Sequence, residues 1–303
     1  MRVPFMMTGI LALSLDAGCV PAPPQISANQ LVREVVYNEL QNHQSHGNWR
    51  YWIESNVHNV SRLEEQVETA EGPVTRLVQS GGQPLTPAIQ IQEQARLNDL
   101  LSSPRQQAAV RRKYADDEAQ IGRILALLPD AFLFNYEGDV NGCHRLTFRP
   151  NPDYPARTIE SRIFHAMSGE LRIDARFKRL VRLDGHLDEN VDFGFGFLGR
   201  LYKGGWFRLE RTQVSATDWK TERMEVHMIG RALVFKSIAR ETSEVRGGFI
   251  PVSARMSFAE GLLLLDRPAD QDASNAEQEI RPLAHGPSRI NPSLTVLKKG
   301  SPQ

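Results

Sequence analysis

Alternation of large apolar residues with small or polar residues is the strongest pattern in this chain. Between Ile163 and Ile238 it recurs in short segments separated by glycine-containing turns, which is typical of an antiparallel meander. The clearest segment is residues 191–197 (VDFGFGF), in which one valine and three phenylalanines fall on one face of a strand and Asp and two glycines fall on the other. Such a face must be buried against helices, a second sheet or an apolar ligand.

Helical periodicity surrounds these strands. Residues 28–43 have apolar side chains near helical spacing. A Thr-Pro pair and a Ser-Pro pair, each typical of a capping residue followed by proline in the first helical turn, predict two helices within residues 86–128. Pro129 predicts the end of the second of these helices. Residues 258–265 form a short apolar segment that we interpret as a helix.

Strand signals come both before and after the paired helices. Residues 49–57 and 132–136 are the best examples outside the meander, and residues 163–165 are interpreted as another strand. Gly247, Gly248 and Pro251 predict the end of the sheet region. These elements predict an α+β fold in which a curved antiparallel sheet forms an incomplete β-barrel, with helices covering the concave side.

The domain organisation predicted from these elements has four parts. They are a signal peptide or lipoprotein signal at residues 1–19, a Pro-rich spacer at 20–28, a single half-barrel domain at 29–265 that contains the helical insertion 86–128, and a polar, Pro-rich and disordered tail at 266–303.

The first 19 residues have the features of an export signal. One arginine precedes a mostly apolar run that is too short to span a bilayer of roughly 30 Å as a helix. Residues 17–19 (AGC) resemble the end of a bacterial lipobox, although Asp16 stands where an aliphatic residue is usual. We therefore expect export to the bacterial periplasm or attachment to an envelope membrane through lipidated Cys19. A buried N-terminus with a chance cysteine is the alternative.

Composition excludes some partners and adds little else. Lys plus Arg and Asp plus Glu both number 36, so the chain has no basic field that would attract nucleic acid. The chain has two cysteines, Cys19 and Cys143. If Cys19 is lipidated or removed, Cys143 is left without a partner, and no structural disulfide is expected.

The order of elements and several short motifs resemble a known family. Residues 169–174 (GELRID), 179–185 (RLVRLDG), 219–220 (WK), 224–226 (MEV) and 233–236 (LVFK) follow one another along the meander. This arrangement is similar to that of the envelope lipoprotein-carrier superfamily, which includes the bacterial outer-membrane lipoprotein-sorting protein. The resemblance covers roughly residues 51–238 and implies a curved, incomplete barrel that binds an apolar ligand. The helices in residues 86–128 are a larger insertion than the simple carriers imply, and no charged residue of the carriers can be assigned to a position here.

A half-closed barrel offers an apolar concave face as a ligand cavity. The apolar stripes of the meander supply candidates for its wall, and methionine suits a surface that repacks around varied partners. The alternative is that these side chains are ordinary core, covered by the helices of residues 86–128. The candidates are Phe193, Phe195, Phe197, Met224, Val226 and Met228.

Catalytic and metal-binding patterns are not found. His43 and His46 have no acidic or cysteine partner nearby, and Cys143 and His144 are neighbours on a predicted strand, so they point to opposite faces. We therefore expect a protein that is not an enzyme and has no cofactor. The expected function is binding of a lipid or a lipoprotein acyl chain. The alternative is a structural or regulatory envelope protein that uses the same fold to bind a protein partner, and a hydrolase is the least favoured reading.

Overall fold

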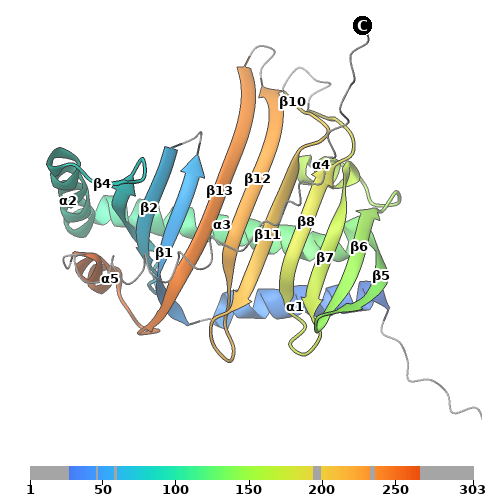
Figure 1. The fold of residues 1–303 in the computed structure, drawn as a ribbon, viewed down its shortest axis with the longest axis horizontal. Helices are drawn as coiled ribbons and strands as arrows, with labels where there is room; N and C mark the ends of the chain where they lie inside the picture. Colours follow the sequence, from blue (N-terminus) through green and yellow to red (C-terminus); the bar gives the residue numbers. More distant parts are fainter. Residues whose placement is uncertain (1–26, 46, 58–59, 194–198, 233–235, 267–303) are drawn as a thin grey trace, which may run out of the picture.

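The computed structural model describes residues 27–45, 47–57, 60–193, 199–232 and 236–266, which form five helices and thirteen strands (Figure 1). The helices are α1 (Ala28–Ser45), α2 (Pro87–Ser102), α3 (Pro104–Ala131), α4 (Ile159–His165) and α5 (Phe258–Leu265). The strands are β1 (Asn48–Val57), β2 (Val60–Val67), β3 (Val74–Ser80), β4 (Gln83–Pro84), β5 (Phe132–Val140), β6 (Cys143–Pro150), β7 (Met167–Asp174), β8 (Leu180–Leu187), β9 (Val191–Phe193), β10 (Gly199–Leu201), β11 (Trp206–Gln213), β12 (Trp219–Ala232) and β13 (Lys236–Val252).

All the strands belong to one antiparallel sheet. Eleven of them run in the order β4-β3-β2-β1-β13-β12-β11-β8-β7-β6-β5, while β10 pairs with β12 and β9 pairs with β10. The last strand in the chain, β13, lies between β1 and β12, so it joins the N-terminal strands to the meander. The two ends of the sheet, β4 and β5, do not pair with each other. The sheet is therefore an incomplete barrel, as the sequence predicts.

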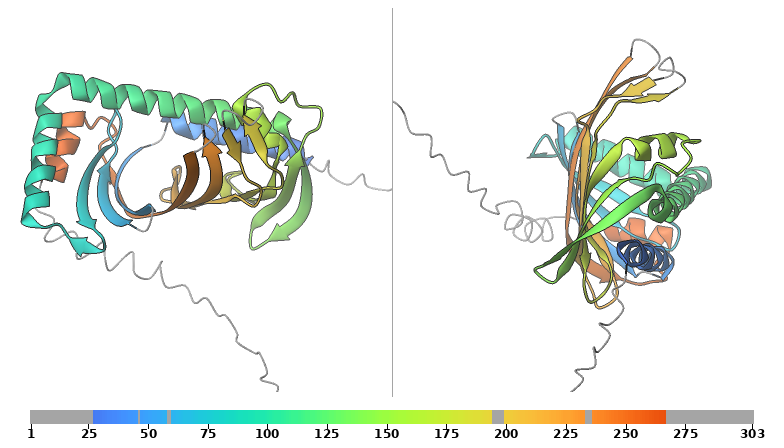
Figure 2. Two further views of the ribbon diagram at one scale, coloured as in Figure 1. Left: turned by 90° about the horizontal axis from the view of Figure 1, so that it is seen from above. Right: turned by 90° about the vertical axis from the view of Figure 1, so that its right-hand side faces the viewer.

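Helices cover the concave side of this sheet. Seen from above, the sheet bends around the side on which α1 and α3 lie, and α3 runs across most of its width (Figure 2). The pair α2 and α5 lies at the other face of β2 and β3. Neighbouring side chains of a strand point to opposite faces of the sheet. Gln66 of β2 lines a cavity with Tyr114 of α3, whereas its neighbour Val67 packs against Phe258 of α5, so α3 and α5 lie on opposite faces.

The main core lies at the β5 end of the sheet. Apolar side chains of α1, α3 and α4 pack there against β5, β6, β7 and β8. Phe132 and Phe148 meet edge to face, with their ring centroids 4.9 Å apart. A smaller cluster joins α2 and α5 to β2 and β3. A third cluster consists of the buried residues Trp49, Tyr51 and Ile53 of β1, against which Val214 and Phe249 pack.

Two predictions of local structure are wrong. Residues 163–165 end helix α4 and are not a strand, because Thr158 and Ser161 form a capping box that starts a helix at Ile159. Helix α3 continues through Pro129 to Ala131. Because Pro129 lies so near the end of the helix, it removes one backbone hydrogen bond without ending the helix there. Burial of Pro129 and Ala131 holds the last turn in place.

Strand β13 also continues beyond its expected end. It runs through Gly247, Gly248 and Pro251 to Val252. The partner β12 stops pairing with it at Val245, so Pro251 has a strand on one side only, where a missing N–H is tolerated. Gly248 has φ +64°, and the register with β1 shifts at this place, which accommodates the extra residue as a bulge.

The signal or lipoprotein signal (1–19), most of the spacer (20–28), Cys19 and all but the first residue of the predicted tail (266–303) lie outside the described residues. Within the described ranges, no helix is both long and apolar enough to cross a membrane.

Candidate binding cavity

A cavity of about 530 Å³ lies between the concave face of the sheet and the helices α1 and α3. Its walls come from segments far apart in the sequence, from Glu39 on α1 to Arg246 on β13. It borders the apolar cluster on β1, because Tyr51 belongs to that cluster and also lines the cavity. Its lining consists of Glu39, Asn48, Tyr51, Gln66, Glu68, Thr69, Pro73, Tyr114, Glu118, Ile121, Leu125, Leu180, Leu209, Arg211, Trp219, Lys220, Thr221, Met224 and Arg246.

The apolar part of the wall is built by strand register. Leu209 of β11 and Met224 of β12 are directly paired, so their side chains lie side by side on the same face. Ile121 and Leu125 of α3 are one helical turn apart and line the opposite wall. These four side chains belong to the cavity lining, so an apolar part of the sheet faces an apolar part of α3 across the cavity.

The polar part of the wall centres on Glu39, which is 3% exposed. Its carboxylate accepts hydrogen bonds from Arg179 Nε at 2.9 Å and Nη2 at 3.0 Å, from the Leu180 amide at 3.1 Å, and from Arg211. Burial alone raises the pKa of Glu39, but Arg211 and Arg179 more than offset it, so its pKa lies below the ordinary value of 4.5. Glu39 is therefore a carboxylate that joins α1 to β8 and β11.

A second ion pair, between Lys220 and Glu68, also lines the cavity. Lys220 Nζ is 2.7 and 2.8 Å from the two carboxylate oxygens of Glu68. Glu68 also accepts from the Trp49 amide at 3.1 Å and from the Tyr51 hydroxyl at 3.3 Å. Burial and the neighbouring Glu68 raise the pKa of Tyr51 well above its ordinary value of 10.0. The charges of this wall are thus largely paired with one another.

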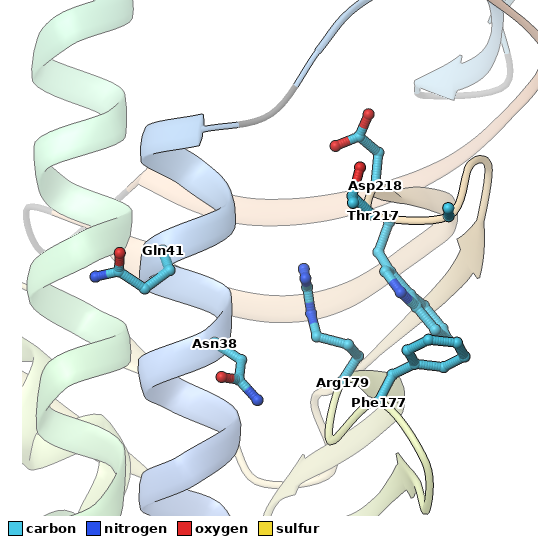
Figure 3. A pocket seen from close by; sticks show the side chains of 8 residues that line it. Asn38, Gln41, Phe177, Arg179, Thr217 and Asp218 are labelled. Atoms are coloured by element: carbon cyan, nitrogen blue, oxygen red, sulfur yellow. The ribbon is translucent and has the colours of Figure 1, made fainter.

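A smaller pocket of about 310 Å³ adjoins the cavity and shares Trp219 with it. Figure 3 shows Arg179 between α1 and Asp218. The Phe177 and Trp219 ring centroids are 6.2 Å apart, and Asp218 accepts a hydrogen bond from Trp49 Nε1 at 3.3 Å. Arg179, Glu39 and Trp219 therefore stand between the two spaces.

The residues proposed for the cavity wall do not all come together. Met224 lines the cavity. Phe193 and Met228 pack against the main core, and Val226 lines another hollow with Trp206 and His227. Phe195 and Phe197 lie outside the described residues.

Several lining residues were not recognised in the sequence. Glu39 had a usable signal, because it lies on α1 one turn after Val35, within a stripe that otherwise buries Leu31 and Val35. A carboxylate in an apolar stripe indicates a buried partner. Arg211 and Lys220 had no such signal, since charged residues are frequent along every strand of this sheet.

Groups with catalytic or metal-binding potential are sparse at the cavity. Among the described residues, no group of three or more His, Cys, Asp or Glu side chains is placed to hold a metal ion. Cys143 is partly buried on β6, and burial raises the pKa of its thiol, which lowers its reactivity as a nucleophile.

Comparison with known proteins adds little. No family model and no curated protein matches this sequence. Among solved structures, the fold is similar to that of a DUF1329 family protein from Desulfovibrio piger, with a TM-score of 0.28 and 8% sequence identity, over 74% of this chain and 93% of that chain. Because both values are low, this likeness has no bearing on the function of the chain.

Proposed function

We propose that this chain is a non-enzymatic cell-envelope protein that binds an apolar chain, from a lipid or a lipoprotein, in the cavity beneath α3. The observation that carries the proposal is the space of about 530 Å³ bordered by Leu125, Leu209 and Met224. This volume lies within the range of about 300–1,000 Å³ that is usual for ligand cavities in proteins. Polar and charged residues share the lining with these apolar side chains.

The energetics of the cavity fit a ligand that is held and later released. Each buried CH₂ of an acyl chain contributes on the order of 0.8 kcal/mol. Much of this gain is offset by the loss of freedom on binding. The charged groups Glu39 and Glu68 already have basic partners, so the attraction comes from the apolar wall.

A pair of tryptophan variants tests this proposal. Met224→Trp adds a large ring inside the cavity, whereas Ile229→Trp places the same ring on β12 at a side chain that is 47% exposed. Binding of a phospholipid with a fluorescent acyl chain is measured by titration for both variants and for the unaltered chain. We expect Met224→Trp to weaken binding at least about tenfold and Ile229→Trp to leave it unchanged.

The outcomes separate the alternatives. If the unaltered chain does not bind the phospholipid, or if both variants bind it equally well, the proposal is wrong. Thermal unfolding of both variants serves as the control, because a variant that unfolds below the temperature of the titration would lose binding for another reason.

A second candidate is a protein-binding module of the envelope. One observation favours it, namely that α2 exposes apolar side chains, with Ile91 71% exposed. Ile91→Glu would then abolish co-purification of a stoichiometric protein partner while lipid binding persists. Retention of the same partner by the Ile91→Glu variant would exclude α2 as its binding surface.

Export and attachment to a membrane through Cys19 are also part of the proposal. The intact mass of the mature protein tests them. A mass that begins at residue 19 and includes acyl chains supports a lipid anchor, and two or more chains are needed for stable attachment. A mass equal to that of the full chain would contradict export by cleavage.

A further inference from the structure

A second cavity, of about 620 Å³, lies at the far end of the sheet from α2. The first turn of α1 lies beside β5 there, as Figure 1 shows, and the Phe134 amide donates a hydrogen bond to Asn29 Oδ1 at 3.4 Å. This cavity shares no lining residue with the cavity beneath α3. Its lining is Ser27, Ala28, Leu31, Phe134, Asn135, Tyr136, His144 and Lys178.

A chain of hydrogen bonds holds the polar side of this cavity. The Tyr136 hydroxyl donates to Asp139 Oδ1 at 2.6 Å, and His144 Nδ1 is 2.6 Å from the same oxygen. Lys178 Nζ is 2.8 Å from His144 Nε2. The Lys178 ammonium has donors only, so Nε2 accepts, and the ring proton of neutral His144 lies on Nδ1 and points to Asp139.

Lys178 is placed by its loop and by α1. It lies between β7 and β8 with φ +51°, a conformation that is uncommon for a residue other than glycine. Its amide donates to the Asp174 carbonyl at 3.0 Å, and its carbonyl accepts from Asn38 Nδ2 at 3.1 Å. The side chain is thereby directed to His144, at the rim of the cavity.

Lys178 is the cation at the rim of the cavity. The Asp139 carboxylate lies at the end of the His144 ring away from Lys178, and because its side chain is 61% exposed, water weakens its attraction for Lys178. One of the three N–H groups of the ammonium donates to His144, which leaves two for a ligand. Beneath the rim, Leu31 and Phe134 form a buried apolar floor.

We propose that this second cavity is a binding site for a medium-chain carboxylate. The carboxylate accepts hydrogen bonds from Lys178, and the alkyl chain lies against Ala28, Leu31 and Phe134. A single lysine matches a monoanion, whereas a phosphate dianion calls for more cationic groups or for the forked geometry of arginine. This proposal does not rest on the function proposed for the cavity beneath α3.

Calorimetric titration of the full chain with decanoate and with decanol tests this site, with both compounds below the concentrations at which they aggregate. We expect decanoate to bind and Lys178→Met to weaken it about tenfold, because a charge-assisted hydrogen bond is lost. Lys113→Met, at an exposed lysine of α3, is the matched control and leaves binding unchanged. We expect decanol to bind more weakly than decanoate.

Three outcomes would overturn the proposal. The first is absence of decanoate binding, including the case in which residues before Ser27 fill the cavity. The second is equal binding of decanoate and decanol together with no effect of Lys178→Met. Decanoate binding that Met224→Trp abolishes and Lys178→Met does not would assign the ligand to the cavity beneath α3, and so would contradict this site without contradicting the proposed function.

Discussion

Replacement of Glu39 by glutamine tests the ion-pair network that forms one wall of the main cavity. The carboxylate accepts from two arginines and from the Leu180 amide, and the arginine side chains are only 9% and 11% exposed. Glutamine has one accepting oxygen, and its NH₂ group would face guanidinium donors. Because Arg179 and Arg211 then lose the charge of the Glu39 carboxylate, we expect Glu39→Gln to lower the free energy of unfolding by about 3–5 kcal/mol.

Urea denaturation followed by tryptophan fluorescence measures this loss. With a urea m-value on the order of 3 kcal/mol per molar for a chain of this length, the midpoint falls by about 1–2 M. Asp130→Asn is the matched control, because Asp130 also joins α3 to α1, through Arg33 at 2.5 Å, but the two side chains are 60% and 57% exposed. The Asp130→Asn substitution should lower the free energy of unfolding by less than about 1 kcal/mol.

The pH dependence of the same variant has a definite sign. The folded-state pKa of Glu39 lies below the ordinary 4.5, so its contribution to stability is present above pH 4.5 and is lost as the pH falls through the folded-state pKa. Glutamine does not titrate, so the difference in free energy of unfolding between the Glu39→Gln variant and the unaltered chain should become smaller in acid. A Glu39→Gln variant no less stable than Asp130→Asn at neutral pH would refute the reasoning.

Three further predictions concern stability. Gly169→Ala should lower the free energy of unfolding by about 1–3 kcal/mol or more, since the new Cβ would lie 1.9 Å from the Asp184 carbonyl oxygen. Gly122→Ala, in helix α3, should instead raise it by about 0.5–1 kcal/mol, because the nearest atom to the new Cβ is 3.8 Å away; urea denaturation measures both changes. Thr158→Ala should cost about 1 kcal/mol, because it breaks the capping box of α4; an unchanged midpoint would contradict that role. Burial raises the pKa of Tyr51, so folding should lose stability as the pH rises above 10, and Tyr51→Phe should reduce this loss in unfolding curves recorded at alkaline pH.

Elements with strong local signals could be predicted from the sequence. The Thr86 and Ser103 caps followed by proline start α2 and α3, and the apolar segment of residues 258–265 is helix α5. The antiparallel incomplete barrel also follows from the alternation and from the family resemblance. The start of α4 was missed, although Thr158 and Ser161 form a cap, because the short apolar run after them also fits a strand.

The site was harder to predict than the fold. Strand alternation identifies which residues share a face, and it groups Met224 with the concave side, but it does not reveal which part of that face is covered by side chains. Met228 and Phe193 pack against the main core, whereas Met224 lines the cavity beneath the middle of α3. That difference depends on where helices from distant parts of the chain lie, which no local pattern records. The pairing of Glu39 with Arg211, 172 residues apart, is of the same kind.

The most direct test of the account is to map where an acyl chain lies. A phospholipid carrying a diazirine in its acyl chain is bound to the full protein and photolysed, and the modified residues are identified by peptide mass spectrometry. The account predicts adducts on the residues around the cavity beneath α3, above all Leu125, Leu209 and Met224. Adducts confined to the outer face of the sheet, or none above the level of a denatured sample, would contradict it.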